Sequence, residues 1–303
     1  MQCVASRETS RTQSQVSYNT QPFPPEIINR IIDELSLWED KTTILACTLT
    51  SPSFRYFSQK RLFEKITLST KHKNETNTLF TLLYKNPDLV SHIREVSLIF
   101  ISDPEGSHDG DFGGSPGDML PDVITKLRNV VSLNFTDLFY HEHADSRVGL
   151  TLDTQKALLQ LGHCAQITYL QFDEVRRWPV SFLCHFPQLR RIEINSSWDP
   201  FVDNATSDLP AELGHIVGTP SELKELQIKY SNSPTLFSCI GASHSGLCAL
   251  AVYSDDASYT STIEELVRSS AATLERLKVY HDQGAGKSER CEETVNLLTL
   301  VLS

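Results

Sequence analysis

Ile167-Thr168-Tyr169-Leu170-Gln171-Phe172 has apolar side chains at its first, fourth and sixth positions. The same spacing returns in Leu189-Arg190-Arg191-Ile192-Glu193-Ile194. Six further copies are Phe63-Ile66-Leu68, Ile93-Val96-Leu98, Val130-Leu133-Phe135, Leu223-Leu226-Ile228, Leu247-Leu250-Val252 and Leu274-Leu277-Val279. The middle residues of successive triplets are 22 to 37 positions apart. Irregular periods of this length predict a solenoid, in which each unit buries its apolar face against its neighbours.

Helical patterns lie between the triplets. They are centred on 78–84, 153–161, 179–185, 211–217, 234–240 and 262–270. Thr262 and Glu265 have capping-box spacing, which supports the start of the last helix. Repeated strand, turn and helix predict a parallel sheet with helices on its other face. We therefore expect an α/β fold, with an irregular array over 69–303 and a flexible Gly-, Pro- and Asp-rich insertion at about 102–118.

Three short helices are expected before the array. Residues 1–21 are polar and predict a disordered tail. From Phe23 to Leu35 the isoleucines follow helical spacing, and a second helix fits Lys41–Leu49. A third fits Ser53–Phe63. A core of this size supplies only a few kcal/mol of stability without a partner, so part of this apolar surface is expected to pack on something else.

Composition excludes several classes of function. The chain is 40% hydrophobic and 21% charged, with a formal net charge of -11. An acidic chain lacks the clustered Lys and Arg of a nucleic-acid-binding protein. No window has the roughly 18 apolar residues of a membrane span. The seven cysteines show no C-x-x-C spacing, and an odd, scattered set indicates free thiols in a reducing compartment. We expect a cytoplasmic or nuclear protein that binds neither nucleic acid nor membrane.

No motif indicates catalysis. Gly284-Ala285-Gly286-Lys287-Ser288 resembles the end of a phosphate loop, but His281 stands where the loop needs its first glycine. No serine lies in a Gly-x-Ser-x-Gly motif, and no histidine pair has the spacing of a zinc protease. We expect no enzymatic activity, no cofactor and no metal.

Three segments carry a likeness to a known family. They are Phe23-Pro24-Pro25-Glu26-Ile27, the stretch from Leu45 to Arg55, and Arg61 to Leu68. With these segments, residues 22–68 resemble an F-box of the type that opens fungal proteins with leucine-rich repeats. The resemblance implies a substrate receptor of an SCF-type ubiquitin ligase. The F-box would bind the Skp-type adaptor and, through it, cullin, while the array would bind a protein substrate.

Two sets of contact residues follow from this interpretation. The expected adaptor-binding residues are Pro24, Pro25, Ile27, Ile28, Ile31, Leu49 and Phe54. Sequence alone does not apportion Ile28 and Ile31 between this surface and the core. The expected substrate-binding residues follow the strands and are Trp198, Asp199, Tyr230, Tyr253, Asp255, Tyr280 and Asp282. Aromatic and charged side chains at strand ends suit binding hot spots.

Two alternatives stay open. The chain could be a leucine-rich-repeat scaffold that binds proteins outside a ubiquitin ligase. At the end of the array, Cys291, Val295, Leu298 and Leu302 have helical spacing. They indicate either a helical cap of the array or a shortened C-terminus.

Overall fold

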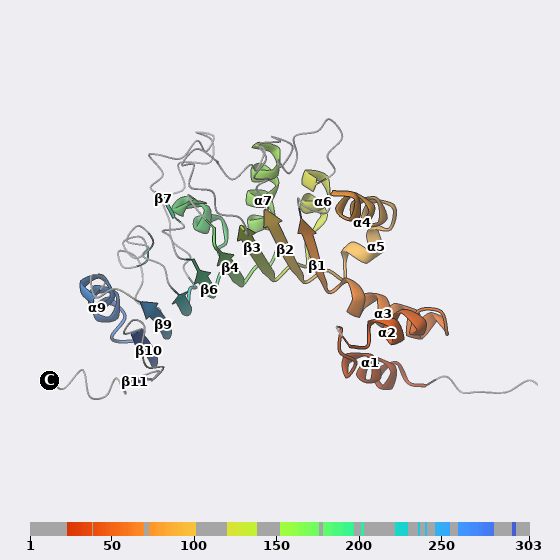
Figure 1. The fold of residues 1–303 in the computed structure, drawn as a ribbon, viewed down its shortest axis with the longest axis horizontal. Coiled ribbons are helices and arrows are strands. Elements are labelled where there is room, and N and C mark those ends of the chain that lie inside the picture. The colour runs from red at the N-terminus through yellow and green to blue at the C-terminus, as the bar shows by residue number, and fades with distance from the viewer. Residues whose placement is uncertain are drawn as a thin grey trace, which may run out of the picture. The chain divides into compact units, whose positions relative to one another are not determined.

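The computed structural model describes two compact units, which divide at residue 58 (Figure 1). The described residues are 23–37, 39–69, 73–100, 120–137, 152–175, 178–196, 201–202, 222–229, 236, 240, 246–254, 260–281 and 293–294. The expected tail 1–21, the insertion 102–118 and the Gly284–Ser288 motif lie outside them.

The first unit is helical, as the apolar spacing predicts. Its helices are α1 Pro25–Asp33, α2 Lys41–Cys47 and α3 Pro52–Phe63, the last of which runs on into the second unit. Pro25 is the first residue of α1, where a missing backbone N–H costs nothing. Helix α2 ends two residues before the predicted Leu49.

A parallel sheet forms the second unit. Its strands pair in the order β1-β2-β3-β4-β6-β8-β9-β10-β11, and only β11 runs antiparallel to its neighbour. The bounds are β1 Lys65–Ser69, β2 Glu95–Phe100, β3 Ser132–Asp137, β4 Tyr169–Asp173, β6 Arg191–Asn195, β8 Glu225–Lys229, β9 Ala249–Ser254, β10 Arg276–His281 and β11 Glu293–Thr294. Chain order and spatial order coincide from β1 to β10, so the predicted α/β class with a parallel sheet is confirmed.

The apolar triplets set the register of this sheet. The middle residues of the eight triplets stand opposite one another from strand to strand, and so do the third residues. The row of middle residues is Ile66, Val96, Leu133, Leu170, Ile192, Leu226, Leu250 and Leu277, all buried. Side chains alternate between the faces of a strand, so both rows enter one continuous core.

A ladder of backbone hydrogen bonds joins each strand entry to the next. The Thr168 carbonyl accepts from the N–H groups of Arg190 and Arg191, and the Arg190 carbonyl accepts from those of Lys224 and Glu225. Five further carbonyls each accept two backbone hydrogen bonds in the same way, those of Glu64, Arg94, Val131, Lys224 and Cys248. Each of these carbonyls lies two residues before the middle residue of its triplet. The ladder therefore holds successive strand entries in line without any side chain of a fixed type.

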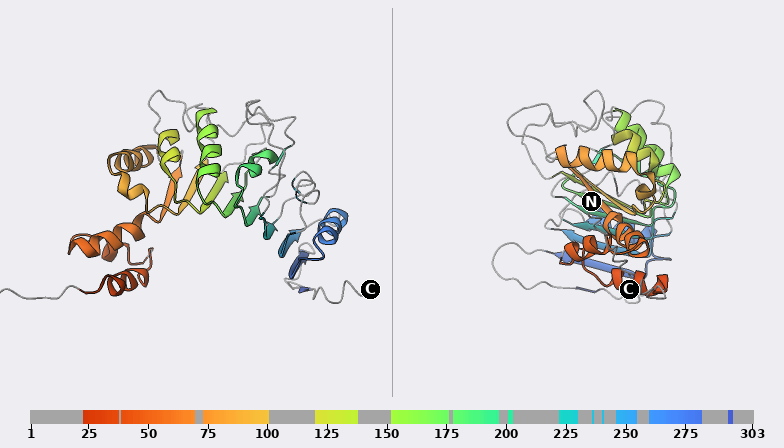
Figure 2. Two further views of the ribbon diagram at one scale, coloured as in Figure 1. Left: turned by 180° about the vertical axis from the view of Figure 1, so that it is seen from behind. Right: turned by 90° about the vertical axis from the view of Figure 1, so that its right-hand side faces the viewer.

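Helices pack on the apolar side of the sheet. They are α4 Lys73–Lys85, α5 Pro87–Val90, α6 Leu120–Lys126, α7 Leu152–Cys164, the 3-10 helix η2 Val180–His185 and α9 Thr260–Ser269. Figures 1 and 2 show α4, α6 and α7 over the same face. Phe135, Phe172, Trp178, Phe182 and Phe186 make ring contacts between this layer and the sheet.

Two predicted helices are corrected. Pro179 belongs to the short strand β5 Trp178–Pro179, which pairs with β7 Phe201–Val202, so helical structure begins only at Val180. Glu293 and Thr294, inside the stretch expected to cap the array as a helix, form β11 instead. The edge of β10 offers unpaired backbone groups at this point, and pairing satisfies them. The predicted helix at 211–217 and most of that at 234–240 lie outside the described residues.

Candidate functional site

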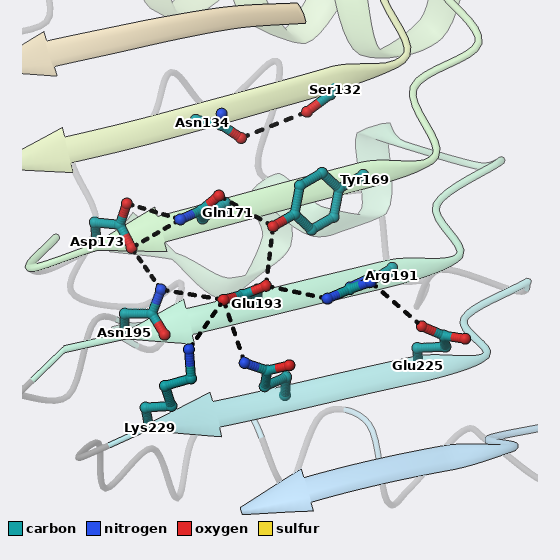
Figure 3. Close-up of polar contacts among 11 residues, drawn as sticks. Ser132, Asn134, Tyr169, Gln171, Asp173, Arg191, Glu193, Asn195, Glu225 and Lys229 are labelled. Carbon is teal, nitrogen blue, oxygen red and sulfur yellow. Dashed lines mark hydrogen bonds and ion pairs between the residues drawn. The ribbon is translucent and has the colours of Figure 1, made fainter. Parts of the chain in front are cut away.

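The face of the sheet opposite the helices is polar. On β4, β6 and β8 the buried triplet residues alternate with half-exposed or exposed polar ones. We call the polar residues of this side the polar face, and Figure 3 shows its centre. Its described members on these strands are Tyr169, Gln171, Asp173, Arg191, Glu193, Asn195, Glu225, Gln227 and Lys229.

Glu193 is the centre of this face. Its Oε1 accepts hydrogen bonds from Asn195 at 3.3 Å, Gln227 at 3.2 Å and Lys229 at 3.3 Å. Its Oε2 accepts from Tyr169 at 3.0 Å and Arg191 at 3.2 Å. The donors come from β4, β6 and β8, so one carboxylate ties three strands together. Its side chain is only 12% exposed.

A second chain of polar contacts runs along β4. Gln171 donates to both carboxylate oxygens of Asp173, at 3.1 and 2.9 Å, and Asn195 donates to Asp173 at 2.7 Å. The Tyr169 hydroxyl lies 3.0 Å from both Gln171 Oε1 and Glu193 Oε2. A phenol has one proton to donate, and an ionised acceptor makes the stronger hydrogen bond, so the Tyr169 hydroxyl donates to Glu193.

These contacts shift two titration equilibria. Burial raises the pKa of Glu193, but hydrogen bonds from Tyr169 and Asn195 and the nearby Lys229 ammonium outweigh it, and the pKa is lowered. The pKa of Tyr169 is raised, first by burial and then by the negative charge of Glu193. Glu193 is thus held as a carboxylate and Tyr169 as a neutral donor.

Ion pairs extend the face toward β10. Glu225 lies 3.7 Å from Arg191 Nη1 and 2.9 Å from Arg276 Nη2. The Lys229 ammonium lies 5.9 Å from the centre of the Tyr253 ring, within cation–π range. Cations and carboxylates interleave, which suits contact with a polar partner surface.

The first unit carries the expected adaptor-binding residues, and most of them are exposed. Pro24, Pro25, Ile27, Ile31 and Leu49 are exposed, and Phe54 is half-buried. Ile28 is corrected: it is 2% exposed and belongs to the core. Ile28 and Ile32 are four residues apart and share the buried side of α1, whereas Ile27 and Ile31 share the exposed side.

The expected substrate-binding residues are placed only in part. Tyr253 lies half-exposed on β9, beside Lys229 of β8. Tyr280 belongs to β10, where its backbone is described. Trp198, Asp199, Tyr230, Asp255 and Asp282 lie outside the described residues.

Sequence reasoning missed two groups of residues. Leu45 is 47% exposed and Phe23 is 64% exposed, although neither is among the predicted contact residues. The second group is the network around Glu193. The sequence does mark these residues, because they occupy the polar positions inside and beside the triplets. Strand pairing then brings those positions together.

Neither a metal centre nor a membrane-spanning helix is found in the described parts of the chain. No three His, Cys, Asp or Glu side chains in the described ranges are grouped to hold a metal ion. No described helix combines the length and apolarity needed to cross a bilayer.

Comparison with known proteins yields no family. No family model matches the sequence, and neither does any curated protein. Among solved structures, one match is a sugar phosphate isomerase/epimerase from Parabacteroides distasonis. It has 8% identity and a TM-score of 0.23, and covers 75% of this chain and 89% of that chain. A likeness at this level supports no inference about the fold or chemistry of the present chain.

Two expectations are corrected by these comparisons. The assignment to F-box proteins with leucine-rich repeats is wrong: no such family is found. Short apolar motifs with helical spacing predict amphipathic helices in general. They do not by themselves identify a family. The expectation that the chain is not an enzyme is withdrawn as well. The partners that the resemblance implied are not tested by these comparisons, and they return only as a proposal that rests on the exposed surfaces of the protein.

Proposed function

We propose that this protein joins two other proteins. The helical unit binds one partner through the exposed apolar side of α1 and α2, and the polar face of the sheet binds another. The expected partners are the Skp-type adaptor of a cullin-based ubiquitin ligase and a protein substrate, so the proposed role is that of a substrate receptor.

The exposed apolar surface of the first unit carries this proposal. Five large apolar side chains on and next to α1 and α2 are exposed to solvent. They are Phe23 at 64%, Ile27 at 46%, Ile31 at 44%, Leu45 at 47% and Leu49 at 83% exposure. Exposed apolar residues that share a helix side, as Ile27 and Ile31 do, are typical of protein interaction sites.

The small core of the same unit supports a docking role. Among the described residues of this unit, the buried apolar side chains are Ile28, Ile32 and Ile44. Fully burying each contributes about 1.5–3 kcal/mol, which is little for a unit of this length. A partner that covers the exposed side would add apolar burial to a unit that lacks it.

The sheet supports the second surface. We infer that its strands belong to an irregular solenoid, because each strand of the nine-stranded sheet neighbours only the strands of that sheet that come directly before and after it in the chain. The backbone ladder that links strand entries repeats once per unit. Solenoids present extended faces to macromolecules, and the polar face provides donors, acceptors and charges of both signs.

Adaptor capture by the purified full-length chain tests the first surface. The variant Ile27→Asp with Leu49→Asp places one charge on the exposed apolar side of α1 and one just after α2. Burying an unpaired carboxylate in an apolar contact is costly, so capture of the Skp-type adaptor should be abolished. A matched control is Leu82→Asp with Tyr84→Asp, which changes two exposed apolar residues of α4 in the second unit.

The outcomes separate the candidate roles. Loss of adaptor capture in the first variant alone supports docking through α1 and α2. Capture of adaptor without cullin favours a scaffold outside a ubiquitin ligase. Failure of the unsubstituted chain to capture the adaptor removes the ligase role.

A further inference from the structure

We infer that the polar face over β6–β10 binds an acidic segment of a partner protein. This inference rests on the proposed function, since it names the chemistry of the partner that the sheet receives. The surface is defined by four cations, Arg191, Lys229, Arg276 and Lys278, and is called the cationic patch.

Strand pairing gathers these cations on one side of the sheet. The pairing aligns Arg191 of β6 with Glu225 of β8, and through Ala249 of β9 with Arg276 of β10. Lys278 lies two residues after Arg276 on β10, on the same face, and stands opposite Ala251. Arg191, Arg276 and Lys278 are exposed, and Lys229 is half-buried. All four therefore face a partner that approaches this side.

The local charge is positive although the chain is acidic. On the described strands β6, β8, β9 and β10 the polar face carries four cations against two carboxylates, Glu193 and Glu225, a net charge of +2. Each carboxylate is shared, Glu193 between Arg191 and Lys229 and Glu225 between Arg191 and Arg276. A guanidinium has five N–H donors and an ammonium three, so the cations keep donors for an incoming anion.

Glu193 does not compete with such an anion. Both its oxygens already accept hydrogen bonds, from five donors in total. Its low pKa keeps it charged, which holds Arg191 and Lys229 in place. Ala249 and Ala251 have short side chains, so an acidic side chain over β9 can reach Arg276 and Lys278, which stand opposite them on β10.

The net charge of the chain selects the kind of anion. A long polyanion such as nucleic acid meets the field of the whole chain, with its charge of -11, and is repelled. A short peptide segment senses charges within a Debye length, about 8 Å at physiological salt. The local +2 then dominates, so an Asp- or Glu-rich peptide segment is the fitting ligand.

The test is fluorescence anisotropy of a labelled octa-glutamate peptide with the full-length protein. Octa-glutamine and octa-lysine peptides serve as probes of matched length. Saturable binding of octa-glutamate alone is expected, and it should weaken as ionic strength rises from about 0.05 M to about 0.15 M. Equal binding of octa-glutamine, or tighter binding of octa-lysine, overturns the inference.

Two double variants locate the binding. Arg276→Gln with Lys278→Gln removes two cations of the patch and should weaken octa-glutamate binding by about fivefold to tenfold. Lys126→Gln with Arg128→Gln removes two exposed cations elsewhere in the second unit and should change it by less than about twofold. Equal weakening by both variants means that net charge alone acts, and overturns the inference. Adaptor capture by the same proteins reports on the proposed function separately.

Discussion

At the scale of single residues, one face of each strand supplies the apolar core and the other face supplies polar contacts. Leu170 is buried at 0% exposure and belongs to the row of middle residues that crosses the sheet. Its neighbour Gln171 is half-exposed and bonds to Asp173 on the same strand. Core side chains lose packing and leave a cavity when truncated, whereas surface polar groups exchange their partners for water.

Leu170→Ala should lower the free energy of unfolding by about 2–5 kcal/mol. Gln171→Ala, one residue away, should lower it by less than about 1.5 kcal/mol. Urea unfolding followed by circular dichroism measures both. Equal losses would contradict the assignment of Leu170 to the core and Gln171 to the polar face.

The lowered pKa of Glu193 predicts that the folded protein loses stability in acid. Its pKa in the folded protein is lowered, so its contribution to stability is present above the pKa of the unfolded chain and is lost as pH falls through the folded value. Below about pH 4.3, the ordinary pKa of a glutamate, the wild-type protein should lose stability faster than Glu193→Gln. Urea midpoints measured between about pH 3 and pH 7 provide the comparison, and parallel curves would show that Glu193 is not linked to folding.

At the scale of elements, α7 and η2 pack at very close range. A Cβ added at Gly162 of α7 would lie 2.6 Å from the His185 carbonyl oxygen and 3.0 Å from a ring carbon of Phe186. The Nε2 atom of His163 lies 2.9 Å from Nδ1 of His185. Only glycine allows the helix to approach η2 this closely.

Gly162→Ala should destabilise the protein by about 1–3 kcal/mol through overpacking, although alanine is favoured by about 1 kcal/mol in an isolated helix. The matched control is Gly246→Ala, whose Cβ would meet nothing nearer than the Lys224 Nζ atom at 3.4 Å. Differential scanning calorimetry measures both variants. A Gly162→Ala protein as stable as the wild type would show that α7 and η2 do not pack as described.

The eight strands that carry the triplets could be predicted from the sequence, while the contacts of the polar face could not. The eight triplets gave the strands and, by their alignment, the rows that pair, because burial requires one face of every strand to be apolar. Glu193 and Tyr169 are 24 positions apart, and nothing in a single triplet shows that they meet. The strand β11 was missed because its pairing depends on the open edge of β10 rather than on its own residues.

At the scale of the whole molecule, the proposed role requires two binding surfaces that act independently. One is apolar and lies on the first unit, around Ile27 and Leu49. The other is charged and lies on the sheet of the second unit, around Arg276 and Lys278. Apolar contacts depend weakly on salt and ion pairs strongly, so the two surfaces should also respond differently to ionic strength.

The dissociation constant of the Skp-type adaptor, measured for three forms of the full-length chain by isothermal titration calorimetry, tests the proposed role directly. The wild type and Arg276→Gln with Lys278→Gln should bind equally. Ile27→Asp with Leu49→Asp should bind at least about a hundredfold more weakly, which is a loss of about 2.8 kcal/mol. Wild-type affinity in a folded Ile27→Asp, Leu49→Asp protein would contradict the account.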